Sequence, residues 1–173
     1  WKLKDLNIPI DGKVLVVGAG KTNSNMCKFL EKHGFTNFVV YNRTMKNGDG
    51  LAEHLGCENR PLTELENYRE GFELIVSCTG SSSYIFTKEL YSKILDGDTK
   101  RKVVIDLAIP NDFDRSIADT HKVKMIAVED LRAIADKNLK EREKELVVCD
   151  KIIQKNLDEF RQIYRERQVE KAM

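Results

Sequence analysis

The residues best suited to chemistry lie between Lys13 and Asn23, where two glycines directly follow a short apolar run (KVLVVGAGKTN). The run, Val14–Val17, is typical of a strand buried on both faces of a parallel sheet. Gly18 permits a tight turn, and Gly20 lets the backbone approach a phosphate group where the next helix begins. We therefore expect a pyrophosphate-binding loop made of Gly18, Ala19, Gly20, Lys21, Thr22 and Asn23. Asn23 stands where the usual pattern has a third glycine, and a plain turn without a ligand is the alternative.

Polar and basic residues follow the second predicted strand, Asn37–Tyr41. A dinucleotide site that prefers NAD usually carries a carboxylate at this position, which binds the ribose hydroxyls. This chain instead has Asn42, Arg43 and Thr44, with Lys46 just beyond. Arg43 can stack on adenine and form charge-assisted hydrogen bonds to a 2′-phosphate, and Asn42 and Thr44 can add further bonds. The pattern favours NADP(H), with an exposed polar turn as the alternative.

A third polar segment follows the predicted strand Leu74–Cys78. Cys78, Thr79 and Gly80, with the serines after them, would lie at the sheet edge that faces the ligand in open α/β proteins. Their small side chains leave room for the nicotinamide half of the cofactor, although a serine-rich helix cap explains them equally well. Cys78 follows an apolar strand and has no histidine near it in sequence, so we expect an unreactive buried thiol.

Catalytic and metal-binding residues are not predicted anywhere in the chain. Asp106, at the end of the strand Val103–Leu107, fits a general acid or a residue that fixes the following loop, in which Pro110 sets a turn. The sequence has no Ser/His/Asp arrangement and no pair of carboxylates suited to acid and base roles. Its histidines and cysteines show no metal-ligand spacing. The cofactor half of an oxidoreductase is visible, and the reacting half is missing.

Composition indicates one ordinary domain with an appended element. The 173 residues are 41% hydrophobic and 33% charged, with a formal net charge of +1, which argues against a strongly basic nucleic-acid surface. Four cysteines without a CxxC pair, and the lack of a signal peptide or long apolar span, favour a cytoplasmic protein that does not enter membranes. Because the chain begins at Trp1 rather than methionine, we expect it to be a segment of something longer.

Strand and helix patterns alternate up to about residue 128. Besides the strands above, we expect a strand at Lys124–Val128 and a short one near Glu58. Helices are expected over Ser24–His33, Leu51–Leu55 and Thr87–Leu95, and near Tyr68 after a capping box of Thr63 and Glu66. Gly48 and Gly50 are assigned to the loop before the second of these. This alternation predicts an α/β fold with a doubly wound, mostly parallel sheet.

From Glu129 onward, the composition predicts one long helix. Its apolar residues recur at alternating spacings of three and four, as in the seam of a coiled coil: Leu146, Cys149, Ile153, Leu157, Phe160 and Tyr164. More than 30 residues of helix would extend about 45 Å or more, beyond the edge of a domain of this size. We therefore expect a dimer or interdomain seam, with packing back onto the same domain as the alternative.

Five motifs in order resemble glutamyl-tRNA reductase over about residues 12 to 165. They are GAGKTN, NRT at Asn42–Thr44, SCTGSS at Ser77–Ser82, DLAIPND at Asp106–Asp112, and EDLRAIADKNLKER at Glu129–Arg142. The NRT motif is shared with shikimate dehydrogenases, whereas the last two motifs in this order are specific to the reductase. The resemblance implies a Rossmann-like NADPH domain over residues 1–128 and a spinal helix over 129–173 that leads to a dimerisation domain.

The resemblance also implies a reaction that this segment performs only in part. In the family, a cysteine of an N-terminal catalytic domain attacks the glutamyl ester of the tRNA. NADPH then reduces the thioester to glutamate 1-semialdehyde for tetrapyrrole synthesis. None of the four cysteines here matches that nucleophile, so the chain alone should bind cofactor and reduce nothing. Implied partners are glutamyl-tRNA, bound through the absent domain, a second copy in a homodimer, and the aminomutase that acts next.

The sequence departs from the family's motifs at two positions, and two alternative functions stay open. The family usually has glycine where this chain has Asn23, and arginine where it has Asn111. The first alternative is a reductase domain like that of shikimate dehydrogenase, with its acid and base residues in another domain. The second is a non-catalytic scaffold that keeps the fold and has lost the nucleotide, as the missing glycine suggests.

Overall fold

In a computed structural model of the chain, residues 6–170 are described, and the side chains of 133, 134, 137, 162 and 165–170 are excluded from that description. Trp1 and the last three residues of the predicted spinal segment therefore lie outside the described residues. The chain divides into two compact units, one reaching Val128 and the other beginning at Glu129. The first unit holds the sheet, and the second is a single helix.

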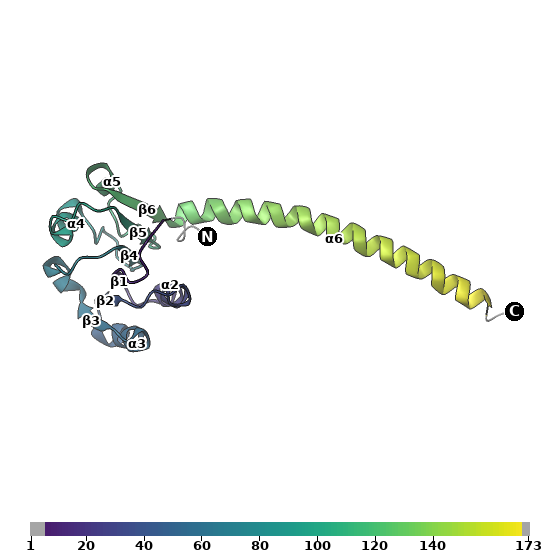
Figure 1. Ribbon diagram of the computed structural model, residues 1–173, viewed down its shortest axis with the longest axis horizontal. Coiled ribbons are helices and arrows are strands. Elements are labelled where there is room, and N and C mark those ends of the chain that lie inside the picture. Colours follow the sequence, from purple (N-terminus) through teal and green to yellow (C-terminus); the bar gives the residue numbers. More distant parts are fainter. Residues whose placement is uncertain (1–5, 171–173) are drawn as a thin grey trace. The chain divides into compact units, whose positions relative to one another are not determined.

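Six strands form the sheet of the first unit, and within the described residues all of their pairings are parallel. The order is β3-β2-β1-β4-β5-β6, so the chain turns from one half of the sheet to the other beside β1 (Figure 1). Their bounds are β1 Val14–Val17, β2 Phe38–Asn42, β3 Glu58–Pro61, β4 Leu74–Ser77, β5 Lys102–Asp106 and β6 Val123–Ala127. The predicted doubly wound parallel sheet is confirmed.

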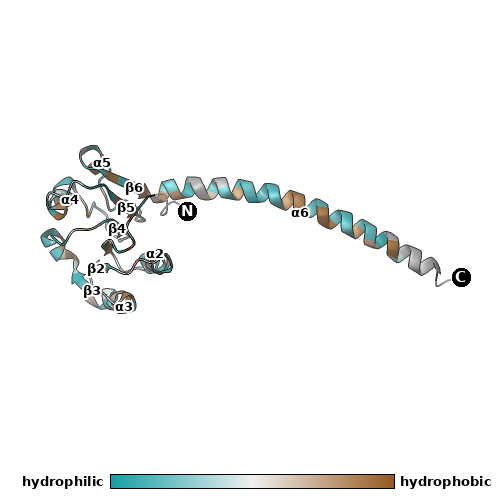
Figure 2. Cartoon of the chain, viewed as in Figure 1, coloured by the Kyte–Doolittle hydropathy of each residue, from teal (hydrophilic) through white to brown (hydrophobic). Residues whose placement is uncertain are grey.

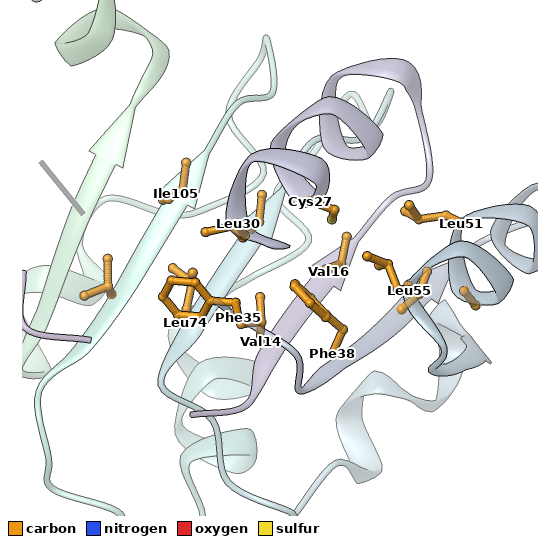
Figure 3. Close-up of a cluster of buried hydrophobic side chains, with 14 of the residues drawn as sticks. Val14, Val16, Cys27, Leu30, Phe35, Phe38, Leu51, Leu55, Leu74 and Ile105 are labelled. Carbon is orange, nitrogen blue, oxygen red and sulfur yellow. The ribbon is translucent and has the colours of Figure 1, made fainter. Parts of the chain in front are cut away.

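Both faces of the sheet are covered, which explains why its central strands are continuously apolar. Val14 and Val16 of β1 point into a core under α2 (Lys21–Lys32) and α3 (Met45–Leu55), part of which is shown in Figure 3. Leu15 and Val17 point the opposite way, because side chains alternate along a strand. There they pack with residues of η1 (Leu62–Asn67), α4 (Lys88–Leu95) and α5 (Ile117–Thr120).

The observed helices differ from the sequence predictions in several places, and α2, for example, begins at Lys21 and not at Ser24. The helix α3 begins at Met45, so Gly48 and Gly50 lie inside it and not in a loop. Gly48 is buried, and a side chain there would collide with Asn59 of β3, so the close packing of helix against strand explains this glycine. The capping box is not formed, because η1 begins at Leu62 after Pro61. The short helix α5 was not predicted.

The second unit is α6, Val128–Glu170, in which apolar positions interrupt a mostly hydrophilic helix (Figure 2). The six residues of the predicted seam, hereafter the α6 stripe, are all exposed. Phe160 and Tyr164, one turn apart, have ring centroids 6.1 Å apart. No helix among residues 6–170 is both long enough and apolar enough to cross a membrane.

Candidate functional site

A crevice of about 390 Å³ lies at the carboxyl ends of β1, β2 and β4, where an open α/β sheet places its ligand. It brings together four segments that are far apart in the sequence. Its lining residues are Gly18, Ala19, Gly20, Asn42, Arg43, Thr44, Asn47, Leu62, Cys78, Thr79, Gly80, Ser81 and Ile85. Of the residues predicted to bind cofactor, Lys21, Thr22, Asn23 and Lys46 do not line it.

Three lining residues were not singled out from the sequence as site residues: Asn47, Leu62 and Ile85. Asn47 lies one helical turn after Thr44, so a helix boundary placed at Met45 would have indicated it. Leu62 is the first residue of η1 and Ile85 lies in the loop after β4, and no local pattern marks either of them. Their position depends on how neighbouring strands bring separate loops together.

The two glycines of the β1–α2 loop have different structural roles. Gly18 has a φ of +91°, and a β-carbon there would collide with the carbonyl oxygen of Cys78, so only glycine fits. Its N–H donates to the carbonyl of Tyr41 at 2.8 Å, which ties the loop to β2. Gly20 is the N-cap of α2, and a β-carbon there would have no atom within 4 Å. The helix therefore presents unpaired N–H groups and its positive dipole end to the crevice.

The side chain of Asn23 holds this loop by hydrogen bonds from the side that faces away from the crevice lining. Its side chain is fully buried, and its Nδ2 donates to the carbonyl oxygens of Val17 and Gly18, both at 2.7 Å. The residue thus joins the first turn of α2 to the end of β1. Asn23 does not line the crevice, and the structure gives it a supporting contact with the loop.

Replacing Asn23 with alanine is expected to lower the free energy of unfolding by about 2 kcal/mol, because both hydrogen bonds are lost inside the protein. Urea denaturation monitored by circular dichroism measures the change. Ser24→Ala is a suitable control, since its hydroxyl bonds the neighbouring Gly20 carbonyl at an exposed site. Equal stability of Asn23→Ala and Ser24→Ala would contradict the linking role.

The end of β2 presents one cation to the crevice. Asn42 is oriented by two hydrogen bonds, since its Oδ1 accepts from the Ala19 N–H at 3.2 Å and its Nδ2 donates to the Thr44 carbonyl at 2.7 Å. Arg43 and Thr44 are exposed beside it. None of the residues that line the crevice in the described part of the chain is acidic. An anionic group beside Arg43 would therefore meet attraction without a nearby repelling carboxylate. Lys46, on α3, is exposed and lies outside the lining.

Cys78 has the surroundings of an unreactive thiol. Burial raises its pKa, and its Sγ donates to the carbonyl of Leu107 at 3.4 Å. Asp106 is buried and fixes the following loop, because its two oxygens accept the N–H groups of Ala108 and Phe113 at 3.1 and 3.0 Å. Of the two roles considered for Asp106, the structure therefore favours the loop-fixing one.

The crevice has the chemistry of a binding site and lacks that of a reaction centre. Arg43 and Cys78 are the ionisable side chains in its described lining, and neither is placed beside a base. No cluster of three potential metal ligands occurs among the described residues. The crevice can hold an elongated anion with a phosphate at the start of α2 and a second anionic group beside Arg43.

Comparison with known proteins gives matches over most of the chain. Residues 4–134 match the family model described as Shikimate / quinate 5-dehydrogenase. The glutamyl-tRNA reductase of Methanosarcina acetivorans is 31% identical over 144 residues, which are 83% of this chain and 31% of that protein. That of Pelotomaculum thermopropionicum is 30% identical over 87% of this chain and 34% of the relative. The chain thus spans about a third of the length of these relatives.

Two solved structures share the arrangement of the chain. The glutamyl-tRNA reductase from Methanopyrus kandleri matches with a TM-score of 0.72 and 30% identity, over 83% of this chain and 36% of that one. The nucleotide binding domain of the Thermoplasma volcanium glutamyl-tRNA reductase matches with a TM-score of 0.60 and 22% identity. The match covers 82% of this chain and 93% of that domain, so the two have the same fold over nearly the whole domain.

Proposed function

This chain belongs to the shikimate / quinate 5-dehydrogenase family, and on that premise we propose that it is the NADP(H)-binding part of a glutamyl-tRNA reductase. The observation that carries the proposal is the composition of the crevice. It combines a glycine loop at the start of a helix with an arginine at the end of β2, and none of its lining residues in the described part of the chain carries a carboxylate. Those features suit a dinucleotide with an extra phosphate on its ribose.

The lining residues indicate how the cofactor would be held. The pyrophosphate fits at Gly18–Gly20, where the N-terminus of α2 supplies N–H donors. Arg43 would bind the 2′-phosphate, which places adenosine on the β2 side. The nicotinamide half then extends toward Cys78–Ser81 on the β4 side. When bound, NADPH would supply the hydride that reduces an enzyme-bound glutamyl thioester to glutamate 1-semialdehyde.

The complete reaction requires groups that the described lining of the crevice does not contain. Because Cys78 is the one thiol of that lining and its pKa is raised, we propose that the nucleophilic cysteine belongs to a separate catalytic domain, which also binds glutamyl-tRNA. This chain alone is then expected to reduce nothing. The aminomutase that consumes glutamate 1-semialdehyde is a proposed partner, and a cytoplasmic location is proposed with it.

We further propose that α6 is the spinal helix of the reductase and contributes to a homodimer. The support is the α6 stripe, whose members are exposed at spacings of three and four residues in the described helix. A second helix of matching pattern would cover such a stripe by packing side chains into the gaps between its residues.

A dehydrogenase similar to shikimate dehydrogenase is the second candidate, because the matching family model bears that description. That model ends at residue 134, six residues into the described α6. By contrast, the glutamyl-tRNA reductase of Methanothrix thermoacetophila is 28% identical over 165 residues, 95% of this chain. Such an alignment necessarily includes most of α6, which supports the reductase over the dehydrogenase.

Calorimetric titration of the 173-residue chain with NADPH and with NADH tests the cofactor proposal. We expect NADPH to bind at least about 30-fold more tightly, because a phosphate bonded to a guanidinium is worth about 2 kcal/mol or more. Similar affinities for NADPH and NADH would show that Arg43 does not bind the 2′-phosphate. If neither nucleotide bound, the scaffold alternative would be supported. Turnover of glutamyl-tRNA by this chain alone would refute the assignment of the nucleophile to another domain.

A further inference from the structure

The wall of the crevice on its β4 side is a loop that runs from Cys78 to Phe86, between β4 and α4. Cys78, Thr79, Gly80, Ser81 and Ile85 of this loop line the crevice. Its first half consists of small residues, and hydrogen bonds within it join Thr79 to Ser81 and Ser81 to Ser83. Further contacts attach both ends of the loop to another part of the chain.

Asp112, in the loop after β5, holds both ends of that wall. Its Oδ2 accepts from the Ser77 hydroxyl at 2.6 Å and from the Thr79 N–H at 2.9 Å, and its Oδ1 accepts from the Thr79 hydroxyl at 2.5 Å. Its backbone carbonyl accepts the N–H groups of Ile85 and Phe86 at 2.8 and 2.9 Å. One residue thus bonds the start of the wall through its side chain and the end of the wall through its backbone.

The residues that follow Asp112 are also held by several contacts. Phe113 stacks on Phe86 with ring centroids 3.9 Å apart, and the Asp114 N–H donates to the Phe86 carbonyl at 3.0 Å. The Phe113 N–H is in turn held by Asp106 at the end of β5. The wall is therefore connected through Asp112 and Phe113 to the central sheet and not only to its own flanking strand.

Asp112 is fully buried and does not line the crevice, so it acts only through other residues. Thr79 connects Asp112 to the crevice lining, because its hydroxyl donates to Asp112 and accepts the Ser81 N–H at 3.2 Å. A carboxylate suits this position because it accepts three donors at once. An asparagine of the same shape would remove the negative charge, so that its bonds to Ser77 and Thr79 would no longer be charge-assisted, and an NH₂ group toward Thr79 would force that hydroxyl to turn from donor to acceptor.

We propose that Asp112 is a positioning residue that sets the shape of the β4-side wall and thereby the affinity for the nicotinamide half of NADP(H). The proposal rests on the proposed function, which places that half of the cofactor against Thr79–Ser81. The adenosine half lies by Arg43 and Asn42, on the other side of the glycine loop. Disturbing Asp112 should therefore weaken binding of the whole cofactor and spare binding of its adenosine part.

The test compares two probes, NADPH and adenosine 2′,5′-bisphosphate, which carries the 2′-phosphate and lacks nicotinamide. For Asp112→Asn we expect about tenfold weaker NADPH binding, because the bonds that hold Thr79 lose their charge assistance, and bisphosphate binding within about twofold of the original. Asp114→Asn is the matched control, because Asp114 lies two residues away and its carboxylate bonds Ser116 and not the wall. It should bind both probes like the unchanged chain.

A second pair of variants tests the same inference if the Asp112→Asn protein does not fold. Thr79→Ser keeps the hydroxyl that donates to Asp112 and should bind NADPH normally, whereas Thr79→Val removes it and should bind about tenfold more weakly. Equal losses for NADPH and the bisphosphate, or unchanged NADPH affinity in Asp112→Asn and Thr79→Val, would overturn the inference and leave the proposed function standing. Failure of the unchanged chain to bind NADPH would refute both.

Discussion

Replacing Arg43 with alanine is expected to weaken NADPH binding about 100-fold and to leave NADH binding within about twofold. Arg43 is the cationic side chain of the described crevice lining, so its removal takes away the charge-assisted bonds to the 2′-phosphate. Such bonds contribute about 1.5–3 kcal/mol each, which corresponds to a loss of this size. NADH lacks the phosphate and should therefore lose little. Titration of both nucleotides into both proteins gives the comparison directly.

Lys46→Ala is the matched control for that experiment. Lys46 carries the same charge three residues further on, is exposed, and does not line the crevice. Its removal should change NADPH affinity by no more than about threefold, because exposed charges interact weakly through solvent at physiological salt. Equal effects of Arg43→Ala and Lys46→Ala would point to general electrostatic attraction and would contradict a specific phosphate contact.

Alanine substitutions at Gly18 and Gly20 are expected to separate folding from cofactor binding. At Gly18 a methyl group would collide with the Cys78 carbonyl, and the backbone is in the left-handed region at +91°. The strain of that conformation, about 1–2 kcal/mol, adds to the collision, so we expect the free energy of unfolding to fall by about 3 kcal/mol or more. Urea denaturation of the 173-residue chain measures it.

Gly20→Ala should have the opposite profile. Its φ of −75° is ordinary and a β-carbon there would have open space, so the free energy of unfolding should change by no more than about 1 kcal/mol. The added methyl would stand at the N-terminus of α2, where the pyrophosphate must approach the backbone, and NADPH affinity should fall at least tenfold. A stable Gly18→Ala protein, or a Gly20→Ala protein with full affinity, would show that the roles of the two glycines are misassigned.

The strands were readily predicted because their signal is local. Val14–Val17 and Leu74–Ser77 are short, mostly apolar runs that are followed by turn residues. A central parallel strand is buried on both faces, so its residues are apolar without the alternation of a half-exposed strand. Helix boundaries were less accurate, since they depend on contacts from elsewhere. The low helix propensity of Gly48 favoured a loop, yet Gly48 lies within α3, and its lack of a side chain lets the helix pack closely against Asn59 of β3.

Most of the residues that line the crevice could be named from the sequence for the same reason. Gly18, Gly20, Arg43 and Thr79 each lie within three residues of the end of a strand, and parallel strands bring their carboxyl ends to one edge of the sheet. Residue type then indicated the chemistry, with glycine for close approach and arginine for a phosphate. Whether these residues bind NADP(H) stays a prediction that the titrations decide.

The supporting roles of residues behind the crevice lining could not be predicted from the sequence. In the sequence, Asn23 is a departure from the usual glycine pattern, whereas the structure shows its side chain buried and bonded to the carbonyls of Val17 and Gly18. Asp112 ends the DLAIPND motif, but it lies 33 residues from Thr79, and the sequence alone does not show that the two side chains are bonded. Sequence alone was enough for the parallel sheet, its ligand edge and the charge preference, which follow from local pattern and strand direction. The hydrogen bonds that hold the site in shape join distant segments, and so they became visible only once the chain was folded.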